Sequence, residues 1–323
     1  MPPTNANTRT DTDAHIGRRV KLRDLQILLS VARLGSMAKA ANELATTQPT
    51  VSQAIAELED AVGARLFDRS TQGVVLTNFG EVLLRSGLEA FDALRQGVRS
   101  IEFLSTPGAG DVWLGCGEST LLGFVPAVIQ RLAQTHPQIV VHIALTAGGG
   151  ESEFLRPLRD RRLDLMIGRW GQARSKDELQ AETLLEDSFT VVTGAHSPWA
   201  RRKKVGLEEL MDEAWIYGEA GNATQRLISE VILARCGRLP RVSVYTTAMS
   251  LRLELLASGE YVSCIPYSVY RHGAQGRPIK ALPIDLGLKV PIALISLKQR
   301  TLSPVVQVFI ECARQVAQEM ASE

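Results

Sequence analysis

A group of short polar side chains falls where the chain is predicted to begin its third helix. Gln48, Thr50, Ser52 and Gln53 occupy the first turns of a segment whose other face is apolar. Amide and hydroxyl groups there can hydrogen-bond base edges in a major groove, and the free N–H groups of a helix N-terminus can bind phosphate. These residue types at this place favour a helix that reads DNA. The alternative is a plain three-helix bundle in which the same face is simply solvated.

Three short amphipathic segments between residues 22 and 66 must position that helix. The second begins at Ser36, a good N-cap, and the third begins near Thr47, with Pro49 tolerated in its first turn. Small alanines on the second helix let a neighbouring helix approach closely, as a helix-turn-helix requires. The apolar positions recur at helical steps, and we expect these residues to face inward: Leu25, Leu28, Leu29, Ala32, Ala40, Ala41, Leu44, Val51, Ile55, Leu58 and Val62.

This segment resembles the winged helix-turn-helix of LysR-type transcriptional regulators. The matching stretches are GSMAKAANEL, TQPTVSQAIAELE, GARLFDRS at Gly63 to Ser70, and VVLTNFG at Val74 to Gly80. Met37 departs from the family, which commonly has an aromatic residue there. Gln53 stands where the family often has Arg or Lys, so one phosphate or base contact is altered. The resemblance implies that DNA is contacted by Ser36, Lys39, Thr47, Gln48, Pro49, Thr50, Ser52, Gln53, Arg69 and Thr77.

Net charge adds nothing to this DNA-binding hypothesis. Residues 1–104 carry 12 basic and 12 acidic side chains, and the whole chain has a formal charge of +1. A DNA-binding domain usually has a basic footprint, which here would have to be local. The motif therefore carries the prediction. The basic residues close to it are Arg18, Arg19, Lys21, Arg23, Lys39, Arg65 and Arg69.

The length of 323 residues suggests two domains and a connector. We expect residues 1–19 to be a disordered polar tail without the apolar core of a secretory signal, and 20–77 to form the winged helix-turn-helix. An apolar stripe over 78–104 predicts one long helix, covered by a second subunit or by the rest of the chain. The family resemblance implies antiparallel pairing of these helices in a dimer. STPGAG at 105–110 is a predicted hinge before an effector domain at 111–323.

Strands and helices alternate beyond the hinge, at the spacing of parallel α/β units. The family resemblance implies a fold like the type 2 periplasmic binding proteins, with two α/β lobes joined by two crossing strands. Lobe I would contain about 111–190 and 285–323, and lobe II about 195–280. The complete fold class is then an N-terminal all-α winged helix-turn-helix followed by this two-lobed α/β domain. The crossings are expected near 190–194 and 282–291.

Loops after the predicted strands mark where a ligand could bind, because open parallel sheets bind ligands beyond their carboxyl ends. Ser119 and Thr120 open a helix, where they could bind a carboxylate or simply cap the helix. Arg169 could hold an anion bidentately or form a surface salt bridge. Glycines at 148–150 would allow close backbone approach to a ligand or would form only a flexible loop. The expected effector site contains Ser119, Thr120, Gly148, Gly149, Gly168, Arg169, Asn222, Thr246, Thr247, Ile265 and Pro266.

Other functional classes have less support. Residues 111–323 would suit a solute-binding protein without a transcriptional role, but the N-terminal domain and the missing signal sequence argue against it. The chain has no G-x-S-x-G, H-E-x-x-H or P-loop, and its five histidines are scattered, so we expect neither an enzyme nor a cofactor. Its four cysteines form no C-x-x-C pair, which argues against a metal. No apolar run approaches the roughly 20 residues of a membrane span.

We therefore expect a cytoplasmic homodimer or homotetramer that binds an inverted repeat in promoter DNA. Its effector would be a small molecule in the cleft of the C-terminal domain, such as an organic or aromatic acid or a sugar derivative.

Overall fold

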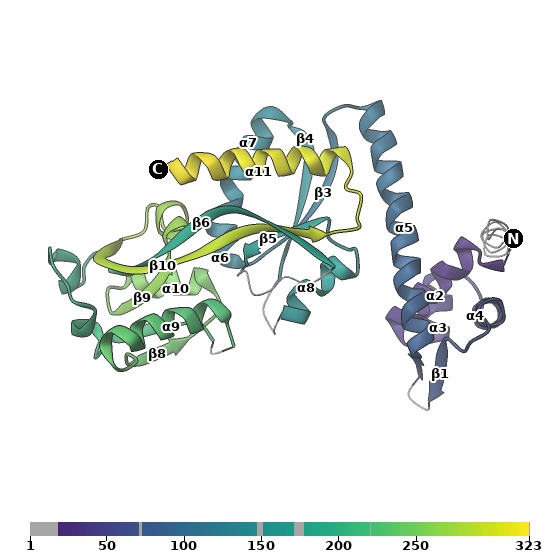
Figure 1. The fold of residues 1–323 in the computed structure, drawn as a ribbon, viewed down its shortest axis with the longest axis horizontal. Helices are drawn as coiled ribbons and strands as arrows, with labels where there is room; N and C mark the ends of the chain where they lie inside the picture. Colours follow the sequence, from purple (N-terminus) through teal and green to yellow (C-terminus); the bar gives the residue numbers. More distant parts are fainter. Residues whose placement is uncertain (1–18, 71–72, 147–150, 171–177, 220, 323) are drawn as a thin grey trace, which may run out of the picture. The chain divides into compact units, whose positions relative to one another are not determined.

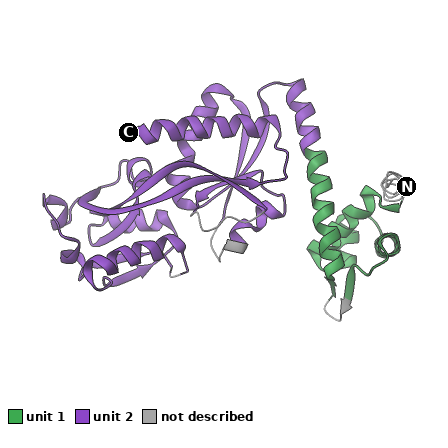
Figure 2. Ribbon diagram, in the orientation of Figure 1, with its two compact units in different colours: residues 1–95 green, residues 96–323 purple. Residues whose placement is uncertain are grey.

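The computed structural model describes residues 19–70, 73–146, 151–170, 178–219 and 221–322. The chain forms two compact units, Met1–Arg95 and Gln96–Glu323, and the boundary falls inside the long helix α5 (Asn78–Ser105) (Figures 1 and 2). The tail expected at 1–19 and the glycines Gly148 and Gly149 lie outside the described residues, apart from Arg19. No helix within the described ranges is both long and apolar enough to cross a membrane.

The first unit is the expected helix-turn-helix with a two-stranded wing. It contains α2 (Leu22–Leu34), α3 (Met37–Glu43), α4 (Gln48–Val62) and the antiparallel hairpin of β1 (Phe67–Ser70) and β2 (Gly73–Leu76). Ser36 caps α3 by accepting from the Lys39 amide, and Thr47 caps α4 by accepting from the Thr50 amide. The fully buried side chains at the centre of its core are Leu28, Val31, Ala40, Val51 and Leu58.

Two local features refine the expected helix-turn-helix. Val62 does not face inward as predicted, because it is the last residue of α4 and is 41% exposed. The wing lies close to the turn between α2 and α3, where the Val74 amide donates to the Gly35 carbonyl at 3.1 Å. Gly73 has φ +132°, and a Cβ there would lie 2.5 Å from that same carbonyl oxygen. A side chain at position 73 would therefore push the wing away.

The second unit is built on one eight-stranded sheet with the order β4-β3-β5-β10-β6-β9-β7-β8. Its strands are β3 (Ala109–Cys116), β4 (Gln138–Leu145), β5 (Leu165–Arg169), β6 (Leu179–Gly194), β7 (Ala214–Tyr217), β8 (Val242–Tyr245), β9 (Tyr261–Pro266) and β10 (Ile279–Leu297). Its α-helices, besides the end of α5, are α6 (Glu118–Gly123), α7 (Val125–Thr135), α8 (Glu151–Arg159), α9 (Ala223–Cys236), α10 (Met249–Ala257) and α11 (Pro304–Ser322).

Two long antiparallel strands, β6 and β10, run through both halves of this sheet. In lobe I, β10 pairs with β5 over 292–295, and β3 pairs in parallel with β4 and β5. In lobe II, β6 pairs with β9 over 189–193, and β7 pairs in parallel with β8 and β9. The crossing strands are therefore much longer than the short crossings expected from sequence. The connection after α5 is shorter than the predicted 105–110 hinge, since α5 ends at Ser105 and β3 begins at Ala109.

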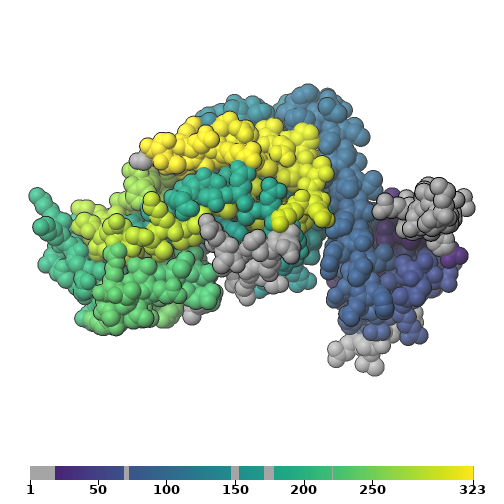
Figure 3. Space-filling view, viewed as in Figure 1, coloured from purple at the N-terminus to yellow at the C-terminus, as the bar shows by residue number. Residues whose placement is uncertain are grey.

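Each lobe has its own apolar core. Lobe I is centred on Phe124 and Phe309, and lobe II on Trp215, all fully buried. Helix α11 packs on lobe I beside α7, and its outer flank borders β6, as the yellow and teal surfaces of Figure 3 show. Arg314 of α11 donates to Glu182 of β6 at 2.7 Å along this border. Two cores joined by two strands leave space for a site between the lobes.

Candidate functional site

The polar face of α4 is largely available to a partner molecule. Gln48, Pro49 and Gln53 are exposed, and Thr50 and Ser52 are half-buried. Ser52 donates from its hydroxyl to the Met37 sulfur at 3.4 Å, so it is partly turned toward α3. The Gln53 side-chain amide donates to Glu57 at 3.0 Å on the next turn of the helix. Among the hydrogen bonds of the described residues, none involves the Gln48 side chain, which leaves its amide available to a partner.

The other residues expected at DNA differ in how freely they can reach a partner. Ser36 and Thr47 accept backbone bonds as helix caps, while Lys39 is exposed on α3. The Thr77 hydroxyl donates to the Arg65 carbonyl at 2.7 Å and accepts from the Gly80 amide at 3.1 Å. Thr77 therefore joins the wing to α5 as a cap, with its hydroxyl already engaged. The side chain of Arg69 lies outside the part of the chain that is described.

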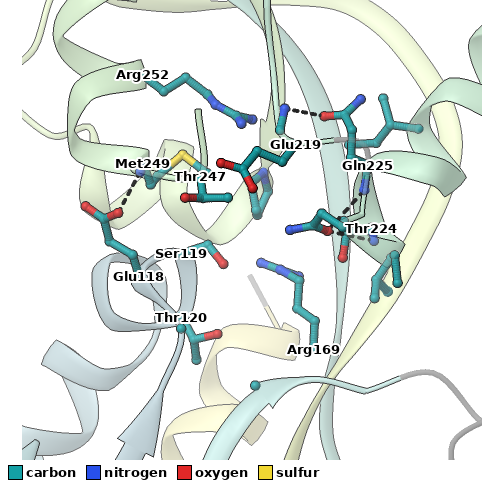
Figure 4. Close-up of a pocket in the computed structure, with 18 of the residues that line it drawn as sticks. Glu118, Ser119, Thr120, Arg169, Glu219, Thr224, Gln225, Thr247, Met249 and Arg252 are labelled. Carbon is teal, nitrogen blue, oxygen red and sulfur yellow. Dashed lines mark hydrogen bonds between the residues drawn. The ribbon is translucent and has the colours of Figure 1, made fainter. Parts of the chain in front are cut away.

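A cavity of about 630 Å³ lies between the two lobes of the second unit (Figure 4). Lobe I contributes the segment after β3, the end of β5 and Phe154 of α8. Lobe II contributes the N-terminal ends of α9 and α10 and the end of β9. Both lobes thus present strand ends and helix starts to the same space, as open α/β sheets do at a ligand site.

Most of the effector residues expected from sequence meet in this cavity: Ser119, Thr120, Gly168, Arg169, Asn222, Thr247 and Pro266. Ile265 does not line it, because neighbouring side chains of a strand point to opposite faces and Ile265 is fully buried in the lobe II core. Thr246 does not line it either. Its hydroxyl accepts from the Ala248 amide at 3.1 Å and shapes the turn before α10.

Arg169 lies at the floor of the cavity rather than on the surface. Its side chain is 9% exposed, and its Nη2 donates to Asp187 of β6 at 2.7 Å. The guanidinium also lies 5.0 Å from the ring centre of Phe189. Its Nε and Nη1 atoms are buried and have no hydrogen-bond partner among the described residues. Burial lowers the pKa of Arg169, and the charge and hydrogen bond of Asp187 oppose that shift. Arg169 thus keeps two donor nitrogens that no described residue uses.

Asp187 links the floor of the cavity to lobe II. It is 3% exposed, and it accepts from the Ser268 amide at 3.1 Å and from the Ser268 hydroxyl at 2.5 Å. Its carboxylate is therefore shared between Arg169 and Ser268, on either side of the crossing strands. Because the negative charge of Asp187 is already well satisfied, the remaining Arg169 donors are the ones that a ligand can use.

Six polar residues of the cavity wall are not among those predicted from the sequence: Glu118, Thr146, Glu219, Thr224, Gln225 and Arg252. Gln225 accepts from the Gly218 amide at 2.7 Å and so fixes the loop after β7 against α9. Arg252 of α10 is 6% exposed and donates to the Thr246 and Cys264 carbonyls, while its Nε has no partner in the described structure. Figure 4 shows Arg169 and Arg252 approaching the cavity from opposite lobes.

Asn222 plays a structural part at the rim of the cavity. Its side-chain oxygen accepts from the Thr224 amide at 2.9 Å and from the Gln225 amide at 3.2 Å, which caps α9. Within the described ranges, no cluster of three or more His, Cys, Asp or Glu side chains could hold a metal ion. The arrangement can bind a small polar molecule, with guanidinium groups, hydroxyls and two aromatic walls in contact range.

Two family models match the chain. The LysR substrate binding domain covers residues 106–318, and the lysR-family bacterial regulatory helix-turn-helix covers residues 22–81. The Escherichia coli (strain K12) relative described as the uncharacterized HTH-type transcriptional regulator YdcI is 26% identical over 92% of this chain and 96% of its own. The HTH-type transcriptional activator CmpR of Synechocystis is 26% identical over 91% and 95%.

Solved structures share the fold over almost the full length. A full-length OxyR from Pseudomonas aeruginosa, carrying a cysteine-to-aspartate substitution, has a TM-score of 0.65 at 21% identity, covering 93% of this chain and 95% of that one. Full-length CbnR in complex with its target DNA has a TM-score of 0.62 at 18% identity, covering 92% and 100%.

Proposed function

The chain belongs to the LysR family of transcriptional regulators, and from this premise we propose that α4 reads its operator and that an anionic metabolite binds between the lobes. It is a DNA-binding regulator with an effector domain, in a family whose members are regulators rather than enzymes. Because its target is promoter DNA, we place its action in the cytoplasm. What remains to be argued is which residues carry each role.

The exposed polar start of α4 supports direct base reading. Gln48 and Gln53 are exposed on the same helix, and Lys39 of α3 is exposed nearby in sequence and free of any ion pair in the described structure. Glutamine can hydrogen-bond a base edge, whereas lysine suits phosphate. One such helix reads only a few base pairs, so a specific operator requires two copies at an inverted repeat.

The exposed face of α5 supports a homodimer, with a homotetramer as a further step. Leu94, Val98, Ile101 and Leu104 are between 50% and 78% exposed along this helix. A stripe of large apolar side chains at helical spacing is costly to leave in water and suits a second copy of the same helix. We therefore propose that the antiparallel pairing expected from the family uses this stripe.

The observation that carries the effector proposal is the pair of buried, unused donors on Arg169. These two nitrogens point to different edges of the guanidinium, and each can donate to a carboxylate oxygen in a charge-assisted bond, which is among the strongest hydrogen bonds in proteins. Ser119 and Thr247 offer hydroxyls, while Phe154 and Phe189 offer apolar walls. An organic acid with a ring or with hydroxyl groups fits this lining.

A metabolite screen by thermal shift on the full-length protein tests this proposal, with Arg169→Gln as the variant. We expect organic acids to raise the melting temperature of the parent and to have at least tenfold weaker affinity for the variant. Arg169→Gln removes a hydrogen-bond partner of Asp187, so the melting temperature of this variant without ligand is measured first. Equal affinity of parent and variant for a discovered effector would show that Arg169 is not the anion site.

A further inference from the structure

Glu118 extends from lobe I across the cleft to lobe II. It is the first residue of α6, directly after β3, and its carboxylate accepts from two amides at the start of α10. Oε2 lies 2.7 Å from the Met249 nitrogen, and Oε1 lies 3.0 Å from the Ser250 nitrogen. Figure 4 shows the Glu118 side chain reaching Met249 at the edge of the cavity. The contact therefore joins residues 131 and 132 positions apart, one in each lobe.

This carboxylate fills a role that α10 cannot fill for itself. The N-cap position of α10 is Ala248, which has no side-chain oxygen and makes no capping bond. The first amides of a helix have no partner inside the helix, and its N-terminus favours a negative charge. Glu118 supplies both the acceptors and the charge. It is an N-cap provided by the opposite lobe.

Arg252, one turn further along α10, provides independent evidence that this end of lobe II is built for an anion. Arg252 is only 6% exposed, and its hydrogen bonds within the described structure go to backbone carbonyls. Its Nε is buried beside the cavity and has no partner among the described residues. A buried guanidinium with no carboxylate at hydrogen-bond distance is costly unless an anion lies close by. Burial alone would raise the pKa of Glu118, but hydrogen bonds from Ser250 and Met249 and the charge of Arg252 lower it below its ordinary value.

We propose that the start of α10 and Arg252 form a carboxylate subsite in lobe II, and that Glu118 is its internal occupant, holding the lobes together until a carboxylate of the effector takes its place. This rests on the proposed effector cleft and assigns its second anchoring point, opposite Arg169. The exchange replaces one carboxylate by another, so the charge balance at α10 is kept. What changes is the connection, because the displaced Glu118 no longer ties lobe I to lobe II.

The test uses the full-length protein, the variant Glu118→Ala and sodium acetate as the probe. Hydrogen–deuterium exchange is followed at the Met249 and Ser250 amides, which donate to no other acceptor than Glu118 in the described structure. We expect exchange at these two amides to be at least tenfold faster in Glu118→Ala. Acetate at tens of millimolar should slow it again in the variant and leave the parent unchanged, with sodium chloride at the same concentration as the salt control.

Three further variants make the result decisive. Glu254→Ala removes an exposed carboxylate of the same helix, which pairs with Arg277, and should leave both amides as protected as in the parent. Glu118→Gln keeps the size of the side chain and one acceptor oxygen, so its two amides should lose less protection than in Glu118→Ala. It takes the place of Glu118→Ala if the alanine variant does not fold. Adding Arg252→Gln to Glu118→Ala should abolish the effect of acetate.

Two outcomes would overturn the proposal: unchanged protection at Met249 and Ser250 in Glu118→Ala, or acetate protecting the variant no better than sodium chloride does. Neither outcome depends on Arg169 or on a known effector. A failure of this subsite can therefore be told apart from a failure of the proposed effector site.

Discussion

Arg99 near the end of α5 donates to both carboxylate oxygens of Asp164, at 2.9 and 3.2 Å. Asp164 immediately precedes β5 and is 1% exposed. It also accepts from the Arg300 guanidinium and from the Trp113 amide, both at 3.0 Å. The last turns of α5 are thus fixed to the lobe I sheet through one buried carboxylate. A rotation of lobe I must carry this end of the helix with it.

The first prediction concerns this buried carboxylate. Asp164→Asn would remove the carboxylate that pairs with both the nearly inaccessible Arg300 and the largely buried Arg99. We expect a loss of about 3–5 kcal/mol in the free energy of unfolding, as when one partner of a buried pair is removed. Urea denaturation of the full-length protein measures it. Asp212→Asn is the control, because its pair with Arg238 is exposed and should contribute less than about 1 kcal/mol. Equal losses of unfolding free energy in both variants would show that the Asp164 carboxylate is not a buried, stabilising ion-pair partner.

The second prediction concerns base reading by α4. Gln48→Ala and Gln53→Ala should each lose about 1–3 kcal/mol of discrimination at particular base pairs of a footprinted operator. Gln48 should lose more, since Gln53 is partly held by Glu57. Arg69→Ala should instead weaken binding to all sequences and reduce the salt dependence. Operator variants titrated in gel shifts separate the two effects. Parental binding by both glutamine variants would show that α4 is not the reading helix.

The helix-turn-helix could be predicted because its determinants are local. Apolar steps of three and four, the caps Ser36 and Thr47, and the glycines that end α2 and α4 all lie within a few residues of the elements they specify. Val62 was misplaced because periodicity does not show where a helix runs out of core to pack against. The long strand β6 was underestimated because much of its lobe I half is exposed and polar.

The site was less accessible to sequence reasoning, because its main contacts are not local. Arg252 stands in SLRLELLA, where an arginine is expected to face water, and only the folded lobe shows it bonded to carbonyls and buried. Glu118 meets amides more than a hundred residues away. Arg169, the last residue of β5, lines the cavity, but its partner Asp187 lies on a crossing strand whose extent the sequence does not reveal.

The third prediction concerns the exposed stripe of α5. Val98→Asp or Ile101→Asp should dissociate the dimer, because each places a charge in a seam that excludes water. Sedimentation velocity measures the loss of the larger species. Phe91 is unsuitable for this test, since it packs against the core of the first unit and an acid there would also unfold it. Val75→Asp in the wing is the matched control, at 64% exposure. An unchanged oligomer in both α5 variants would show that the exposed stripe of α5 is not the dimer interface.

The fourth prediction concerns the acid sensitivity of the lobe contact made by Glu118. Burial alone would raise its pKa, but in the folded protein the bonds from Ser250 and Met249 and the charge of Arg252 outweigh burial and lower it. A lowered folded-state pKa gives stability that is fully present above the unfolded-state value of about 4.3 and is lost as the pH falls through the folded-state value.

The parent should therefore be more stable than Glu118→Gln by a constant margin at neutral pH, and this margin should shrink below about pH 4.3. Urea midpoints of both proteins at several pH values between neutral and acidic measure it. A margin for Glu118→Gln that stays constant into acid would mean that the carboxylate is not held by α10 in solution.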